Sequence, residues 1–248
     1  YPYRKRGFHG ATLHTGALHV VGGWDGNSTG GIQYAESLRS TDAGLLAGEV
    51  VVGNGLTPLS YCELASFDNK LFLSTGYNGT LPPQPPDDQV SDRIKFSGND
   101  GHDWEDLIIA GLTPHEAGAL LVHDGFLYDF GGLFYDYAVN PHYGMNKKAF
   151  RIGPGLTVEQ RSADTGFYRR SFAHALWKGA VVTHGGINDS VSGVYFNDVW
   201  RSTDGLQSIS KIADGVSIGS IQGHAMVPFV VNGVERLFIA GGVWAGGP

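Results

Sequence analysis

ALHVVGG (17–23), FLYDFGG (126–132), AVVTHGG (180–186) and LFIAGG (237–242) are four copies of one pattern, a hydrophobic run that ends in paired glycines. A fifth, degenerate copy is LFLSTG (71–76). Its glycine and the last glycines of the other copies are 53, 56, 54 and 56 residues apart: Gly23, Gly76, Gly132, Gly186 and Gly242. Spacing this constant indicates an internal repeat of roughly 50 residues.

Other features keep the same spacing as the glycines. A turn precedes each hydrophobic run, as in Asp124-Gly125 and Asn232-Gly233, and such pairs are strong hairpin signals. Two more strand-like segments follow each of the first four runs, for example 199–205 and 208–213. Each unit is therefore expected to be four short strands, which is typical of a propeller blade. The predicted units of this single domain are 6–56, 57–112, 113–166, 167–218 and a partial unit at 219–248.

The composition agrees with an all-β domain. The 248 residues include 38 Gly and 12% aromatic residues but only 17% charged residues, which disfavours a helical bundle with its Glu- and Lys-rich surface. A hydrophobic content of 42% excludes global disorder. No apolar run approaches the length of a membrane helix, so no membrane span is expected. The net charge of -7 gives no reason to expect a nucleic-acid partner.

These residues resemble the Kelch repeat, with its hydrophobic run and Gly-Gly, a preceding Gly-His (223–224) and a later Asp-Val-Trp (198–200). The turns at 40–44 and 202–205 are similar to Asp-boxes, and 97–101 is a looser version. The resemblance covers nearly the whole chain and implies a Kelch-like β-propeller in which both motifs hold the blades together. Ser and Asp side chains satisfy backbone groups in such turns, and paired glycines allow neighbouring backbones to approach.

The fifth unit has only two expected strands, which would leave an exposed sheet edge. We predict five blade positions around one axis, with the segment Tyr1 to Gly7 lying against the fifth unit. Pro2 in this segment suits an edge, because it has no N–H group to donate. Another possibility left open is self-association of the chain through the open edge.

Long loops follow the glycines at 24–36, 77–91, 133–147 and 187–197. In an antiparallel meander they share one face, here called the long-loop face, with the starts of the first strands. Long ordered loops on a rigid scaffold often bind ligands. Aromatic and basic residues gather on this face, and we expect ligand contacts from eight of them: Trp24, Tyr135, Tyr137, His142, Tyr143, Arg169, Arg170 and Trp244. An otherwise acidic protein would then carry a basic, aromatic patch.

This patch favours an extracellular or cell-surface binding module that holds a glycan or a protein, because aromatic rings stack on sugars and guanidinium groups bind carboxylates. One alternative is a propeller-type polysaccharide lyase acting on a uronate-containing glycan. It would use an Arg to neutralise the uronate and a Tyr or His to move the α-proton, from among Tyr135, His142, Tyr143, Arg169 and Arg170. A second alternative is a structural repeat in a self-assembling protein. The sequence favours a protein that is not an enzyme.

No metal site and no cofactor are expected. The ten His show no zinc-like spacing, and no neighbouring Tyr-His pair accompanies Cys62 to support a copper site like that of the Kelch-related galactose oxidases. Glycosylation sequons begin at Asn27, Asn78 and Asn188, each shortly after the end of a hydrophobic run. Their shared place in the repeat favours N-glycosylation and a secreted or cell-surface location.

Overall fold

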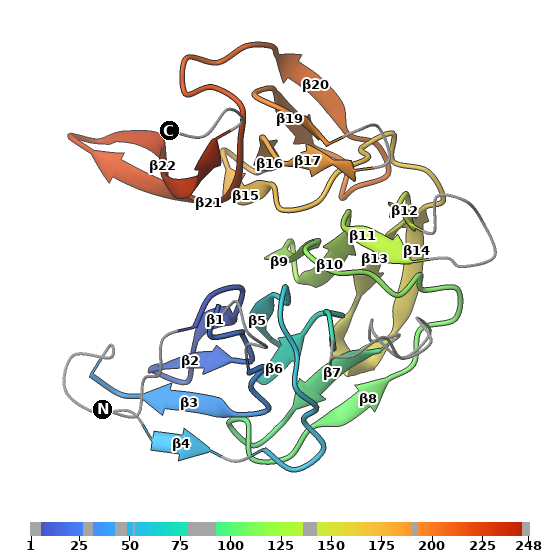
Figure 1. The fold of residues 1–248 in the computed structure, drawn as a ribbon, viewed down its shortest axis with the longest axis vertical. Coiled ribbons are helices and arrows are strands. Elements are labelled where there is room, and N and C mark those ends of the chain that lie inside the picture. Colours follow the sequence, from blue (N-terminus) through green and yellow to red (C-terminus); the bar gives the residue numbers. More distant parts are fainter. Residues whose placement is uncertain are drawn as a thin grey trace.

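The computed structural model describes residues 6–26, 32–42, 49–51, 53–78, 93–135, 143–189 and 193–244. Figure 1 shows five groups of strands that follow one another along an arc, from the first unit in blue to the fifth in red. Four groups are four-stranded sheets with antiparallel neighbours, and the fifth is a two-stranded hairpin. The prediction of an all-β propeller built from four-stranded antiparallel blades, with the last one incomplete, is confirmed.

The strands occupy the segments that the repeat indicated. The first sheet contains β1 (Gly10–His14), β2 (Ala17–Val21), β3 (Ser37–Ser40) and β4 (Glu49–Val51). The second contains β5 (Leu64–Phe67), β6 (Lys70–Leu73), β7 (Ile94–Ser97) and β8 (Glu105–Leu107). The third contains β9 (Ala119–His123), β10 (Phe126–Phe130), β13 (Ala149–Ile152) and β14 (Val158–Ser162). The fourth contains β15 (Ala173–Trp177), β16 (Ala180–His184), β19 (Val199–Ser202) and β20 (Ser210–Ala213), and the hairpin contains β21 (Ile221–Val231) and β22 (Val234–Trp244).

Two small hairpins lie in loops that the sequence did not resolve into strands. β11 (Leu133–Tyr135) pairs with β12 (Tyr143–Met145), and β17 (Ile187–Asn188) pairs with β18 (Val194–Tyr195). A single 3-10 turn, η2 (Pro154–Leu156), connects β13 to β14. The long loops of the third and fourth units are therefore partly ordered by their own backbone pairing.

The hydrophobic core lies between neighbouring sheets. Leu59, Leu64 and Val21 belong to a cluster that joins the first and second sheets, and Phe72 and Phe150 to one that joins the second and third. Two further clusters join the third sheet to the fourth and the fourth to the fifth hairpin. The innermost strands β1, β5, β9, β15 and β21 contact one another in that order. Stability therefore comes from burial between units as well as within them.

The paired glycines place each unit against the next, as predicted from the sequence. Gly131 has a φ of 72°, and a Cβ there would lie 2.7 Å from the Phe172 ring of the next unit. The following residue, Gly132, donates its N–H to Arg169 O at 3.0 Å. In the second unit, where Thr75 replaces the first glycine, its hydroxyl donates to His115 O at 2.5 Å. The link between units is kept although the residue differs.

The turn between the third and fourth strands is closed by side chains. In the fourth unit the Ser202 hydroxyl donates to Asp204 at 2.9 Å, and Asp204 accepts from the Ser208 N–H at 3.1 Å and from its hydroxyl at 2.6 Å. In the second unit Ser97 and Asn99 pair in the same way at 3.0 Å. Gly205 has the positive φ that was expected.

The fifth hairpin departs from the pattern in two ways. Its strands have eleven residues each, whereas the other first and second strands have four or five. No third strand pairs with β22 among the described residues, and large side chains such as Phe229 and Phe238 are exposed. The predicted contact between the N-terminal segment and this hairpin falls mostly on residues outside the described part. Its described members, Arg6 and Gly7, bond instead to the first unit.

Candidate functional site

Five equivalent residues, one at the start of each unit, form a collar around the centre of the arc. The collar residues are Phe8, Tyr61, Ala117, Ser171 and Gly223. The N–H of each collar residue after Phe8 donates to the carbonyl of the preceding one, at distances of 2.8, 2.8, 2.8 and 2.7 Å. All five residues have φ between 53° and 63°, a conformation that costs energy for a side chain as large as Phe or Tyr. The repeat therefore aligns five backbones around one centre.

The collar lies at the long-loop end of the sheets. The residue before each of the first four collar positions pairs with a residue just after the hydrophobic run of its own unit: Gly7 with Trp24, Ser60 with Tyr77, Glu116 with Leu133 and Arg170 with Ile187. The first strands and the long loops therefore begin side by side, as the meander predicted.

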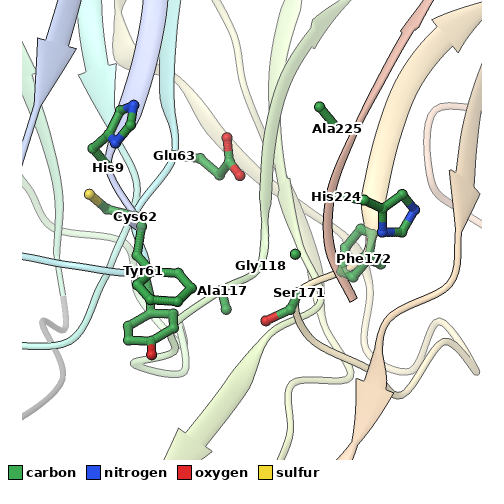
Figure 2. A pocket seen from close by; sticks show the side chains of 12 residues that line it. His9, Tyr61, Cys62, Glu63, Ala117, Gly118, Ser171, Phe172, His224 and Ala225 are labelled. Carbon is green, nitrogen blue, oxygen red and sulfur yellow. The ribbon is translucent and has the colours of Figure 1, made fainter. Parts of the chain in front are cut away.

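A central pocket of about 370 Å³ is lined by the collar, by the residue that follows it in each unit and, in the second and fifth units, by the next residue as well. This volume is within the range of small-molecule sites. Its polar side chains come from His9, Glu63, Ser171 and His224, together with the phenol of Tyr61. Among the described residues the lining contains no Lys or Arg. Figure 2 shows His9 and Cys62 on one side of the pocket and His224 and Phe172 on the opposite side.

Glu63 is the only acidic residue in the pocket lining. Ser74 holds the Glu63 backbone in place, because its hydroxyl accepts a hydrogen bond from the Glu63 N–H at 2.8 Å. The carboxyl group points toward the middle of the pocket (Figure 2). Burial raises its pKa to about 7, because desolvation disfavours the charged form. A carboxyl with a strongly raised pKa in a concave site is a candidate functional group.

The other titratable groups of the lining are neutral near pH 7. Burial lowers the pKa of His9, and the charge of Arg6 lowers it further. Burial and the neighbouring His184 lower the pKa of His224 to about 4. Burial raises the pKa of Cys62 to about 12, so the thiol is unreactive. Glu63 is thus the group whose charge changes around neutrality.

An aromatic stack borders the pocket. The ring of Phe8 lies on that of Tyr61 with centroids 4.1 Å apart, and the ring of Trp24 stacks with Phe8 at a centroid distance of 6.5 Å. Phe8 is 47% exposed although it is a large apolar residue. Trp24 was predicted as a ligand contact. In the structure it belongs to this aromatic stack because its ring contacts Phe8.

The described arginines of the predicted basic patch are ion-paired. Arg169 is 3% exposed, and its guanidinium binds the Asp198 carboxylate at 2.5 Å and Gly185 O at 3.0 Å. Arg170 pairs with Asp189, and Arg6 pairs with Glu36. Each of these cations has a carboxylate partner, while residues 4 and 5 lie outside the described part of the chain. The role of Arg169 seen here is to brace the fourth unit.

The remaining predicted contacts lie at varied places. Tyr135 and Tyr143 face each other across the β11–β12 pairing, and only their backbones are described. Tyr137 and His142 lie outside the described residues. Trp244 ends β22, pairs with Ile221 and is 52% exposed. Among the residues proposed for a lyase, the side chains of Arg169 and Arg170 are described, and both are already ion-paired.

The sequons are described only in part. Asn27 lies outside the described residues, and so do the second and third residues of the Asn78 sequon. Asn188 lies in β17 with 8% of its surface exposed, a placement that disfavours it as a glycan acceptor.

Sequence reasoning missed Phe8, His9, Tyr61, Glu63 and His224 as site residues. For Glu63 a signal was available in the repeat itself. The equivalent residue, two positions after the collar, is Gly10, Ala119, Ala173 or Ala225 in the other units. One large charged residue among four small ones marks a break in the repeat.

Metal binding and membrane spanning were also considered in terms of the described residues' own side chains and helices. No group of three or more His, Cys, Asp or Glu in this part of the chain is arranged to hold a metal ion. No helix there is long and apolar enough to cross a membrane.

Comparison with known proteins supports the fold. No protein-family model matches the sequence, and no curated protein matches it closely enough to count as a relative. A solved structure described as that of YjhT matches with a TM-score of 0.73 over 98% of this chain and 78% of that chain. The two sequences are 11% identical, so the likeness concerns the fold alone. The chain has a β-propeller-like fold.

Proposed function

We propose that this protein is a binding module that holds a sugar-sized ligand in the central pocket on its long-loop face. The observation that carries the proposal is the convergence of all five units on one pocket of about 370 Å³. Its border is the exposed stack of Trp24, Phe8 and Tyr61. Aromatic faces supply large contact area to sugar rings, and a few convergent polar groups fix orientation.

The Kelch resemblance and the sequons support the rest of the proposal. A Kelch-like propeller places its long loops around such a pocket, and a secreted or cell-surface location would expose it to glycans or to protein ligands. A protein ligand would contact the loops more broadly than a glycan. The two ligand classes can therefore be separated by variants confined to the pocket.

A glycan array followed by calorimetry on the best hit tests this function, with a protein pull-down for the other class. Tyr61→Ala and Phe8→Ala should weaken glycan binding by about tenfold each, since one stacking contact is removed. Phe229→Ala is the matched control, because this ring is exposed on the fifth hairpin and lies outside the pocket lining. A folded protein that binds nothing on the array or in the pull-down would exclude the proposal.

Self-assembly is a second candidate, supported by a different observation. Phe229, Val230 and Phe238 on the fifth hairpin are each at least 60% exposed, and large exposed apolar patches mark interaction sites. Light scattering at rising concentration tests it. An oligomer that Phe238→Ser converts to a monomer supports self-assembly, and a monomer at all concentrations excludes it.

A further inference from the structure

We propose that the ligand of the central pocket carries a protonated amine, as an amino sugar does, with the Glu63 carboxylate as its counter-ion. This inference rests on the binding function proposed above and specifies the chemical class of the ligand. It is argued from the place of Glu63 in the repeat, from its lack of a partner, and from the groups that surround it.

The place of Glu63 is set by the repeat. Of the five equivalent positions, two line the pocket, Glu63 and Ala225. The other three carry glycine or alanine, namely Gly10, Ala119 and Ala173. Glu63 alone among them extends a long side chain toward the middle of the pocket (Figure 2).

The carboxyl group has no partner within the protein. Among the described residues it makes no hydrogen bond and no ion pair, in contrast to Asp198 and Asp189, which bind arginines. Burial alone raises its pKa. Glu63 is half-buried in the open pocket. A partly desolvated carboxylate without a counter-charge is unfavourable, so a ligand that brings a cation would relieve this cost.

The surrounding groups do not supply that cation. His9, beside β1, and His224, in β21, both have lowered pKa values and are neutral at pH 7. Cys62 is buried as a thiol, and Tyr61 has a raised pKa because of burial and the charge of Glu116. Glu116 itself, behind Ala117, is held beside Arg170 and Asp189. The pocket wall therefore carries no positive charge of its own.

The aromatic border fits the same ligand. The faces of Phe8 and Tyr61 attract cations as well as sugar rings, and both rings belong to the pocket lining. An anionic sugar would instead place its carboxylate near Glu63 with no free arginine in the lining. The chemistry of the pocket therefore favours an amino sugar over a uronate.

Three trisaccharides with one backbone test the inference by calorimetry at pH 7: β-1,4-linked glucosamine, its N-acetylated form, and β-1,4-linked glucose. We expect the free amine form to bind at least about tenfold more tightly, the effect of one charge-assisted hydrogen bond. Glu63→Gln should remove this preference. Glu105→Gln, an exposed carboxylate on β8, is the matched control and should keep it.

Proton release gives a second readout. Binding of an ammonium group should ionise Glu63, so the measured enthalpy should depend on the ionisation enthalpy of the buffer for the wild type and not for Glu63→Gln. Equal binding of all three sugars, unchanged by Glu63→Gln, would overturn the amine inference and leave the binding function standing. If none of the three binds while the array shows binding to an amine-free glycan, the inference fails in the same way. No binding to any glycan or protein would overturn the binding function itself.

Discussion

The four complete sheets and the fifth hairpin share one sequence pattern but bury it very differently. Val182 in the fourth unit and Phe238 in the fifth unit are equivalent residues, each three positions before the first glycine of the pair. Phe72 is their equivalent in the second unit. Val182 and Phe72 are 1% and 0% exposed, whereas Phe238 is 66% exposed. Val182 and Phe72 lie on strands that pair with a third strand and pack against a neighbouring unit. Phe238 has no third strand beside it among the described residues. The pattern therefore determines strand and turn, and burial depends on the neighbours.

The largest expected effect uses this pair of positions directly. Phe72→Ala should lower the free energy of unfolding by about 3–5 kcal/mol, because it opens a cavity in a packed core. Phe238→Ala should change it by less than about 0.5 kcal/mol, since the ring is already exposed. Urea denaturation measures both. If Phe72→Ala does not fold, Phe72→Leu gives a smaller loss in the same direction; equal losses at the two sites would contradict the comparison.

A smaller effect is expected from the buried ion pair of the fourth unit. Arg169 and Asp198 join the segment before the first strand to the segment before the third. In the fifth hairpin, Ile221 stands at the position equivalent to Arg169, so this ion pair has no counterpart there. Asp198→Asn should cost about 3 kcal/mol, because it leaves a buried guanidinium without its counter-charge. Asp189→Asn, which breaks the more exposed pair with Arg170, should cost about 1 kcal/mol or less. Thermal melts that rank the two variants in the opposite order would refute this assignment.

The docking of the fifth hairpin should depend on pH. His224 of β21 lies 2.9 Å from His184 of β16, Nε2 to Nδ1, and its pKa is lowered to about 4. The unfolded hairpin therefore binds more protons between about pH 6.5 and pH 4, and stability falls as pH falls through that window. Hydrogen exchange of β21 and β22 should become faster by the equivalent of about 2 kcal/mol between pH 7.5 and pH 5, after correction for intrinsic rates. Unchanged protection, or an equal loss in β5 to β7, would argue against this pair as the cause.

The smallest effect concerns the turn between the third and fourth strands, which the fifth hairpin lacks. Asp204→Ala removes the acceptor for Ser202 and for the Ser208 N–H and hydroxyl. The expected loss is about 1 kcal/mol, the usual contribution of such turn and capping bonds. Chemical denaturation should detect it, with Asp214→Ala as an exposed acidic control. A loss as large as that of Phe72→Ala would mean that the turn has a further role.

Much of the fold could be predicted from the sequence because strand, turn and glycine signals recur in each unit. The Gly-Gly spacing located β2, β10, β16 and β22, and the turn residues located their partners. The sequence could not show that the acids paired with Arg6, Arg169 and Arg170 lie beside them, since these partners are 19 to 30 residues away. The ion pairing of these three arginines therefore appears only in the structure.

The candidate site was harder to predict because it depends on where the repeat is broken. A search for repeats emphasises the residues that agree, such as Gly131 and Gly132. Glu63 was overlooked because it stands where the pattern requires only a small residue. Its significance appears once the structure shows its carboxyl group pointing into the central pocket (Figure 2).

A titration of the Glu63 carboxyl tests the central claim, that the five units enclose this group in a pocket without a partner. Carboxyl carbon NMR on the ligand-free protein, with Glu63→Gln to assign the signal, measures it directly. The structure predicts a midpoint near pH 7. The folded state would then bind more protons than the unfolded state between pH 4.5 and pH 7, and Glu63→Gln should be the more stable protein above that window, by up to about 3 kcal/mol. A midpoint near the ordinary value of 4.5, with no gain in stability for Glu63→Gln, would contradict the account.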